Sequence, residues 1–217
     1  FEKLLIARNI DKDGENGKVK TESISNITYL NLNDTTLKVA DLTGIQDFTA
    51  LETLFCYSAA LTTLDVSKNV NLITLDCSNN KLTSLDLSKN SKLKSLNFSN
   101  NALTTIDLSA NSNITSLSVY NNQLSTLDLS KNTALLTMSA NNNKLTVLDL
   151  TKNVNLTSVT VSNNLLTSLD VSQNTKLAAL TITENQLTSI DLSKNTLLSS
   201  LFANTNKLKS LDVSNNK

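Results

Sequence analysis

A pattern of apolar residues and asparagines returns with a 21-residue period from Leu61 to the end of the chain. The unit from Leu82 to Ala102 reads LTSLDLSKNSKLKSLNFSNNA and contains the spacing LxxLxLxxN twice, first in an 11-residue half and then in a 10-residue half. Self-similarity with a period of about 20 to 50 residues is typical of solenoids, in which each repeat packs on its neighbours. The sequence therefore predicts an elongated stack of coils.

Each unit contains two short stretches in which apolar and polar residues alternate, LDL and LNF in the unit above. Alternation with a period of two predicts short strands with one buried face, and no window offers the roughly 10 to 12 residues of helical periodicity that a helix needs. One strand on each broad face of the coil predicts two parallel sheets with about 4.8 Å between rungs. A single coil buries too little apolar surface to offset its lost conformational entropy, so we expect neighbouring coils to share their stability.

Asparagine occupies two positions of the repeat in coil after coil. A side-chain amide both donates and accepts hydrogen bonds, so it can satisfy turn backbone that has no ladder partner. We therefore interpret both columns as structural supports of the turns. The first column is Asn69, Asn90, Asn111, Asn132, Asn153, Asn174 and Asn195, and the second is Asn80, Asn101, Asn122, Asn143, Asn164, Asn185 and Asn206.

The motif LxxLxFxxNxL from Leu93 to Leu103 resembles the leucine-rich repeat, and its double occurrence resembles the nested 21-residue subclass found in bacterial proteins. The resemblance covers nearly the whole chain from Ile27. It implies a leucine-rich repeat solenoid, wound as a right-handed superhelix with little helix beyond an N-terminal cap. The connection 37–49 contains ADLTGIQDF and gives a longer, 24-residue first coil, which is similar to the internalins. We expect a short convex helical turn there, with Leu42, Ile45 and Phe48 covering the edge of the core.

The two ends of the chain depart from the repeat. Residues 1–26 are predicted to form a cap, with a short helix near residues 1–8 followed by an acidic loop, and residues 27–217 to form the repeat array within a single structural domain. In the first coil Thr35 takes the place of the asparagine. Lys217 falls inside a coil, so we expect the natural chain to continue beyond it.

The N-terminal loop, residues 11–22, resembles a calcium loop of the EF-hand type. Asp11, Asp13, Glu15 and Glu22 provide carboxylates at its positions one, three, five and twelve. Its glycine stands at position seven, as Gly17, instead of position six. The sequence thus leaves two interpretations, a calcium site or a polar glycine-containing turn.

Composition excludes several classes of function. The 217 residues include 19 basic and 19 acidic side chains, and lysines alternate with aspartates, which argues against a nucleic-acid partner. The chain has no histidine, which rules out Ser-His-Asp and Cys-His catalysis and histidine metal sites. Its three glycines form no nucleotide-binding loop, and no apolar run of about 18 residues predicts a transmembrane segment. Cys56 and Cys77 share one inward column, so we expect reduced, buried thiols.

One outward column is aspartate in every coil. Neighbouring carboxylates about 4.8 Å apart repel by ~1 kcal/mol each in water, and lysines three residues later together with flanking Ser and Thr can offset this. We predict a structural role, with cation binding or acid–base chemistry as the alternative. The column is Asp65, Asp86, Asp107, Asp128, Asp149, Asp170, Asp191 and Asp212.

The other face varies from coil to coil. In leucine-rich repeats the corresponding strand lines the concave side, and a variable surface on a rigid frame can encode recognition. Exposed aromatics are typical anchors of such surfaces, although a plainly solvated sheet is the alternative. The predicted partner-binding residues are Phe55, Tyr57, Asp76, Asn97, Ser118, Tyr120 and Phe202.

These features predict a non-enzymatic binding module, monomeric, that recognises a protein or a cell-surface glycan. The resemblance implies an exported bacterial protein at a cell surface or outside the cell, where an adhesion role is expected. An enzyme is one alternative, and without histidine it would need a pair of carboxylates for its chemistry. A structural or ice-binding solenoid is the other alternative, and would use the threonine column Thr62, Thr83, Thr104, Thr146, Thr167 and Thr188.

Overall fold

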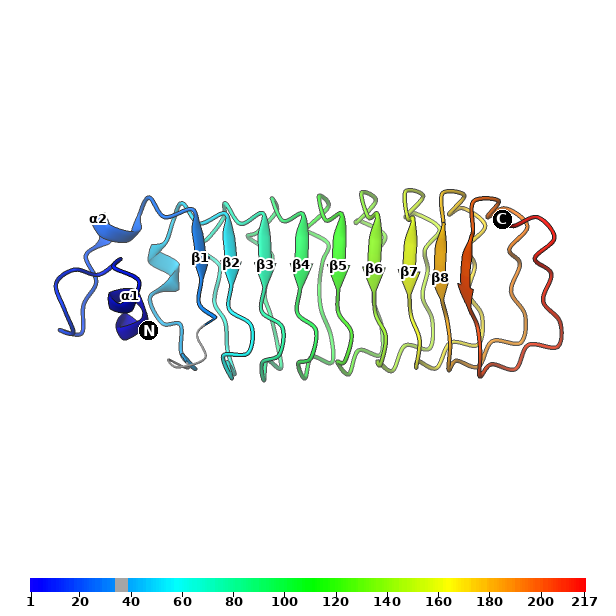
Figure 1. Cartoon of the computed structure of the whole chain (residues 1–217), viewed down its shortest axis with the longest axis horizontal. Coiled ribbons are helices and arrows are strands. Elements are labelled where there is room, and N and C mark those ends of the chain that lie inside the picture. Colours follow the sequence, from blue (N-terminus) through cyan, green and yellow to red (C-terminus); the bar gives the residue numbers. More distant parts are fainter. Residues whose placement is uncertain (34–38) are drawn as a thin grey trace.

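The chain winds into an elongated stack of coils with its two termini at opposite ends (Figure 1). The computed structural model describes residues 1–33 and 39–217, so Thr35 lies outside the described residues. Two short helices, α1 (Glu2–Ala7) and α2 (Thr21–Ile24), form the N-terminal end, and a 3-10 helix spans Ile45–Asp47. The strands are β1 (Tyr29–Asn31), β2 (Thr53–Phe55), β3 (Thr74–Asp76), β4 (Ser95–Asn97), β5 (Ser116–Ser118), β6 (Thr137–Ser139), β7 (Ser158–Thr160), β8 (Ala179–Thr181) and β9 (Ser200–Phe202).

The nine strands form one parallel sheet in the order of the sequence. The register follows the repeat, since Leu54 of β2 pairs with Leu75 of β3, one 21-residue period further along the chain. Between β1 and β2 the pairing of Leu30 with Leu54 reflects the longer, 24-residue first coil. From β1 to β8 the central residue of each strand is buried and its two neighbours face outward. The predicted leucine-rich repeat solenoid is thereby confirmed.

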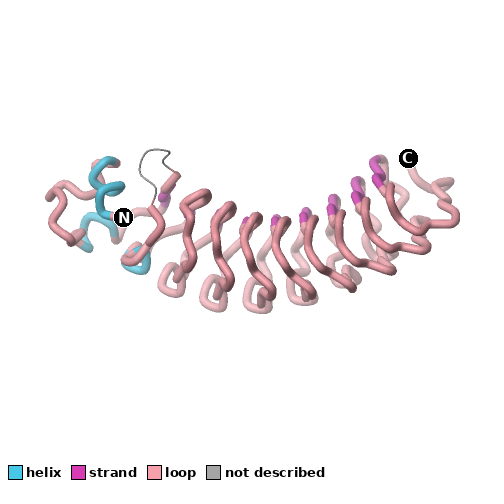
Figure 2. The backbone as a smooth tube through the Cα atoms, turned by 90° about the horizontal axis from the view of Figure 1, so that it is seen from below, coloured by secondary structure: helices cyan, strands magenta, loops and turns pink. Residues whose placement is uncertain are grey.

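The second sheet predicted from the LDL stretches is wrong for the residues that the structure describes. The stack curves, and the single sheet follows the inside of the curve (Figure 2). On the outside of the described coils, neighbours share one backbone hydrogen bond, as from Ala102 N to Leu82 O at 2.8 Å, and none along Leu85 to Leu87. The outer side of an arc is longer than the inner side, so its rungs lie too far apart for a ladder. Leu85 and Leu87 are nevertheless buried, so their alternation reflects burial and not strand pairing.

The N-terminal cap closes the first coil. Leu4 and Leu5 of α1 and Ile24 of α2 belong to the same hydrophobic core as the coils. The sequence predicted one helix in the cap, and α2 is a second one that it did not predict. The helical turn expected in the connection 37–49 is the 3-10 helix. Its predicted edge-covering residues are buried, namely Leu42, Ile45 and Phe48.

Both cysteines are free and buried, as predicted. Burial raises the pKa of the Cys56 thiol and of the Cys77 thiol. A buried thiol of this kind acts as a small apolar side chain in the core.

The asparagine columns support the turns, as predicted. In the first column Nδ2 reaches two backbone carbonyls of the preceding coil, as Asn132 does with Leu108 O at 3.1 Å and Asn111 O at 2.9 Å. In the second column the amide also accepts, as when Leu103 N donates to Asn122 Oδ1 at 3.1 Å. Each of these side chains therefore ties one coil to the one before it.

Replacing Asn132 or Asn122 by alanine is expected to lower the free energy of unfolding by about 1–3 kcal/mol each, because buried backbone groups lose their partners. Urea denaturation midpoints measure the effect. Asn113→Ala is the control, since Asn113 is exposed and makes a single bond, to Ser91 O. Unchanged midpoints in both buried variants would contradict the structural role of the columns.

Candidate functional site

Five of the seven predicted partner-binding residues are outward residues of the strands, and the other two follow the strands closely. Phe55, Asp76 and Asn97 are the last residues of β2, β3 and β4, where the outward side chain follows a buried central one. Ser118 and Phe202 hold the same position in β5 and β9. Tyr57 and Tyr120 each follow two residues after this position. The structure therefore places five of the seven on the strands, which line the inside of the curve (Figure 2), and Tyr57 and Tyr120 just past the ends of β2 and β5.

Aromatic side chains are exposed at both ends of this surface. Tyr57 is 38% exposed at the N-terminal end and Phe202 is 55% exposed on the last strand. Tyr29 of β1 is 57% exposed and was not among the residues predicted from the sequence. Its ring centroid lies 5.9 Å from that of Phe55, with the ring planes at 70°. The available signal was its outward place in the first strand, where it pairs with Thr53 and so belongs to an outward column that the prediction did not include.

Polar side chains between the aromatics are held by hydrogen bonds across the coils. Asn97 Nδ2 donates to Asp76 Oδ2 at 3.0 Å, and the Oγ atoms of Ser99 and Ser118 are 2.8 Å apart. Ser78 and Ser99 hold the position of Tyr57 in the next two coils, where the alternation predicts outward side chains, but both are buried. Their backbone N–H groups donate to Asp76 Oδ1 and Asn97 Oδ1, respectively. The surface is therefore preorganised, and fewer of its side chains reach solvent than the alternation predicted.

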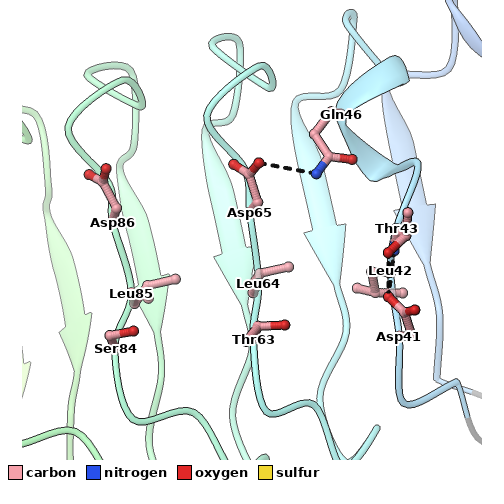
Figure 3. Close-up of a pocket in the computed structure, with 10 residues that line it drawn as sticks. All are labelled: Asp41, Leu42, Thr43, Gln46, Thr63, Leu64, Asp65, Ser84, Leu85 and Asp86. Atoms are coloured by element: carbon pink, nitrogen blue, oxygen red, sulfur yellow. Dashed lines mark hydrogen bonds between the residues drawn. The ribbon is translucent and has the colours of Figure 1, made fainter.

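The convex side carries a shallow depression of about 380 Å³ beside the 3-10 helix (Figure 3). Gln46 Nε2 donates to Asp65 Oδ2 across it at 3.1 Å. The other oxygen of Asp65 accepts from Ser67 N, and Asp86 accepts likewise from Ser88 N. These carboxylates are already used by the turns. The depression is lined by Asp41, Leu42, Thr43, Gln46, Thr63, Leu64, Asp65, Ser84, Leu85 and Asp86.

The aspartate column has the structural role predicted for it. In every coil Oδ1 accepts a hydrogen bond from the backbone N–H two residues later, at 2.8 to 2.9 Å. This bond, and the nearby hydroxyl group, lower the pKa of each carboxyl below its ordinary value of 3.8. For Asp149 the hydroxyl of Thr151 is the larger cause of the lowered pKa. Each aspartate of the column therefore stabilises one turn of its own coil.

Acidification is expected to destabilise the fold below about pH 4, because carboxyl groups with a lowered folded pKa stabilise it only above their unfolded pKa. That contribution is lost as the pH falls through the folded pKa, which lies below 3.8. Urea midpoints between pH 7 and pH 2, at constant ionic strength, measure the loss. The triple variant Asp107→Asn, Asp128→Asn and Asp149→Asn retains the acceptor oxygens but does not titrate, so its loss should be shallower. Identical profiles would refute the linkage.

The four residues of the predicted calcium loop do not come together as one set of ligands. Asp13 pairs with Lys20 at 2.9 Å and Glu15 with Lys3 at 3.3 Å. Asp11 is buried and accepts from Asp13 N, while Glu22 lies in α2. Among residues 1–33 and 39–217, no three metal-ligating side chains lie close enough to hold an ion. The calcium site stays a prediction from the sequence, without support from this arrangement.

The loop instead has the geometry of a glycine-containing turn. Gly14 and Gly17 have positive φ angles of 79° and 78°, which glycine adopts at little cost. Glu2 Oε1 accepts from Asn16 N at 2.9 Å and Gly17 N at 3.0 Å, so α1 holds the loop in place. Hydrogen bonding by Asn16 N is the main cause of the lowered pKa of Glu2.

Comparison with known proteins supports the fold and its family. A family model described as leucine-rich repeats, in two copies, matches residues 70–110. The functional domain of InlJ from Listeria monocytogenes, which includes a cysteine ladder, is 39% identical with a TM-score of 0.88. That comparison covers 91% of this chain and 44% of the other. No curated protein sequence gives a significant match.

Two further structures share the fold at lower identity. A leucine-rich repeat protein from Leptospira interrogans is 24% identical with a TM-score of 0.81, over 88% of this chain and 52% of its own. The internalin InlF from Listeria monocytogenes is 23% identical with a TM-score of 0.75, over 95% of this chain and 69% of its own. The chain thus spans about half the length of the InlJ and Leptospira structures. None of the helices in the described residues is long and apolar enough to cross a membrane. Together with the stacked 21-residue coils, these likenesses show that the chain belongs to the leucine-rich repeat proteins and resembles the bacterial internalins.

Proposed function

We propose that this chain is a non-enzymatic binding module that recognises a protein or a cell-surface glycan through the concave face of its sheet. The observation that carries the proposal is the set of aromatic side chains exposed on that face, above all Tyr29, Tyr57 and Phe202. Aromatic groups bury a large area with little loss of rotamer freedom, and they dominate binding hot spots. The Ser, Thr and Asn side chains around them supply adaptable hydrogen bonds.

The likeness to InlJ and InlF supports a location outside the cell or at a bacterial cell surface, where an adhesion role fits. We propose that the module works there as a monomer. The seven residues Phe55, Tyr57, Asp76, Asn97, Ser118, Tyr120 and Phe202 form the proposed contact surface, joined by Tyr29.

The alternative functions have less support. The aspartates that could serve an enzyme or bind cations accept turn hydrogen bonds on a convex, exposed surface, whereas catalysis is favoured in a cleft. The threonine column proposed for ice binding, which includes Thr83 and Thr104, lies on convex backbone that forms no strand. Because the stack curves, that side is not the flat surface that an ice-binding array requires (Figure 2).

A pair of matched variants tests which face binds. An array of extracellular proteins and cell-surface glycans is probed with the wild-type chain, with Ser139→Lys and with Ser125→Lys. Ser139 faces outward on β6, whereas Ser125 is exposed on the convex side, so the same chemical change is placed on opposite faces. We expect Ser139→Lys to abolish capture and Ser125→Lys to preserve it. The opposite result would place the binding surface on the convex side.

A further inference from the structure

Three aromatic residues and one carboxylate gather at the N-terminal end of the concave face. Tyr29 and Phe55 lie on β1 and β2 with their ring planes at 70°, so they form two walls of a corner. Tyr57 follows Phe55 on the same face, and two of the three tyrosines of the chain are therefore here. Asp76 is the direct neighbour of Phe55 on β3. These four residues are called the aromatic–acidic cluster below.

Asp76 is the one charged residue among the outward residues of β1 to β9. The other outward residues of β1 to β9 are Ser, Thr, Asn, Ala, Tyr or Phe. The ion pairs found within the described residues join Lys3 to Glu15 and Lys20 to Asp13, and neither involves Asp76. Its carboxylate thus forms no ion pair there, on strands whose other outward side chains are neutral, and its neighbour on β2 is aromatic.

The Asp76 carboxylate is also held in place. Ser78 N donates to Oδ1 at 2.9 Å and Asn97 Nδ2 donates to Oδ2 at 3.0 Å. A carboxylate oxygen can accept more than one hydrogen bond, so both oxygens of this partly exposed side chain retain acceptor capacity. A fixed acceptor loses little conformational entropy when a partner binds.

This combination suits a cation. The face of an aromatic ring attracts ammonium and guanidinium groups, and a planar guanidinium can stack on a ring while it donates to a carboxylate. A neutral sugar could stack on the rings but would leave the carboxylate charge uncompensated, and an anionic ligand would be repelled by it. We propose that the aromatic–acidic cluster binds a cationic side chain, arginine or lysine, presented by a protein partner. This inference rests on the proposed function, since it names the partner chemistry at one end of the concave face.

The test uses the full chain and a defined probe. Amide chemical shifts of the 15N-labelled protein are followed by NMR during titration with the capped peptide acetyl-Gly-Arg-Gly-amide, and with the same peptide carrying citrulline in place of arginine. Citrulline keeps the shape but removes the charge. We expect saturable shifts on β1 to β3 with the arginine peptide, and at least about fivefold weaker binding with citrulline.

Matched variants separate charge from fold. Asp76→Asn should weaken arginine binding at least about fivefold, whereas Asp86→Asn on the convex side should leave it unchanged. Asparagine is compatible with this position, because Asn97 occupies the same column one coil later and accepts from Ser99 N in the same way. Equal binding by the citrulline peptide, unweakened binding by Asp76→Asn, or no shifts on β1 to β3 would each overturn the proposal. Shifts there with a neutral oligosaccharide such as maltotriose, and none with arginine, would also overturn it.

The result of this titration is independent of the capture experiment with Ser139→Lys and Ser125→Lys. Capture that Ser139→Lys abolishes, combined with no arginine binding, would reject the cationic site and retain the concave binding surface. Arginine binding at the cluster, combined with capture that Ser125→Lys abolishes and Ser139→Lys leaves intact, would instead retain the cationic site and reject the concave face as the main binding surface.

Discussion

Replacing Phe98 by alanine is expected to lower the free energy of unfolding by about 3–5 kcal/mol. Phe98 is fully buried and lies in the inward column between Cys77 and Val119 of the adjacent coils. Backbone hydrogen bonds join this coil to the coils on both sides, from Cys77 N to Asn97 O at 2.9 Å and from Phe98 N to Ser118 O at 3.1 Å. The coils therefore cannot collapse into the space that the ring leaves, so most of the cavity persists.

Phe202→Ala is the control, because its ring is 55% exposed and makes little contribution to the core. We expect a change within about 0.5 kcal/mol for this variant. Urea denaturation followed by circular dichroism gives the midpoint and slope of each. In a stack of coils each unit is stabilised mainly by its neighbours, so a broadened transition in Phe98→Ala would be consistent with local unfolding of the central coils. Equal midpoints for the two variants would contradict the assignment of inward and outward columns.

The sequence determines the register of the sheet because the period is constant. Residues one period apart become neighbours on adjacent strands, as with Phe55 and Asp76. Alternation then assigns the strand residues to a face, which suffices for Phe55, Asp76, Asn97, Ser118 and Phe202 but not for the column of Tyr57, where Ser78 and Ser99 are buried. The turn function of the asparagines follows from the same logic, since an amide repeated in every coil meets the same backbone groups each time.

The sequence does not reveal how the stack curves. The stretches LDL and LNF have the same alternation, yet only the second forms a ladder, because the curve brings coils together on one side and separates them on the other. Leu85 and Leu87 are buried in either case. Alternation reports which side chains are buried, whereas strand pairing depends on the distance between rungs, and that distance is a property of the whole stack.

The sequence predicted which positions of the repeat contribute to the site, but not the exposure and hydrogen bonds of each side chain. Tyr29 was missed because it pairs with Thr53, in the outward column that precedes the buried central residue, whereas the prediction used only the columns of Phe55 and Tyr57. The bonds from Asn97 to Asp76 and between Ser99 and Ser118 depend on rotamers, which no spacing specifies. The acidic loop shows the opposite error, since its spacing suggests shared ligands while Asp13 forms an ion pair with Lys20.

Once a partner has been captured, Tyr57→Ala and Tyr120→Ala are each expected to weaken its binding by about 2 kcal/mol or more, roughly thirtyfold in Kd. Both rings lie on the concave face, Tyr57 exposed and Tyr120 partly exposed, and neither belongs to the hydrophobic core. Their loss should therefore remove contact area without changing the urea midpoint. Tyr57→Phe and Tyr120→Phe separate the ring from the hydroxyl, and should retain most of the affinity if the buried area dominates.

Asp86→Ala and Asp128→Ala are the controls on the opposite face, and should change the binding free energy by no more than a few tenths of a kcal/mol. Each loses the carboxylate that accepts the backbone N–H of Ser88 or Ser130, so any effect should appear in stability. Isothermal titration calorimetry with the captured partner, alongside urea midpoints for all the variants, distinguishes affinity from stability. If the aspartate variants weaken binding while the tyrosine variants do not, the partner lies on the convex side. The aspartate column would then combine its turn function with recognition, and the exposed aromatics would require another explanation.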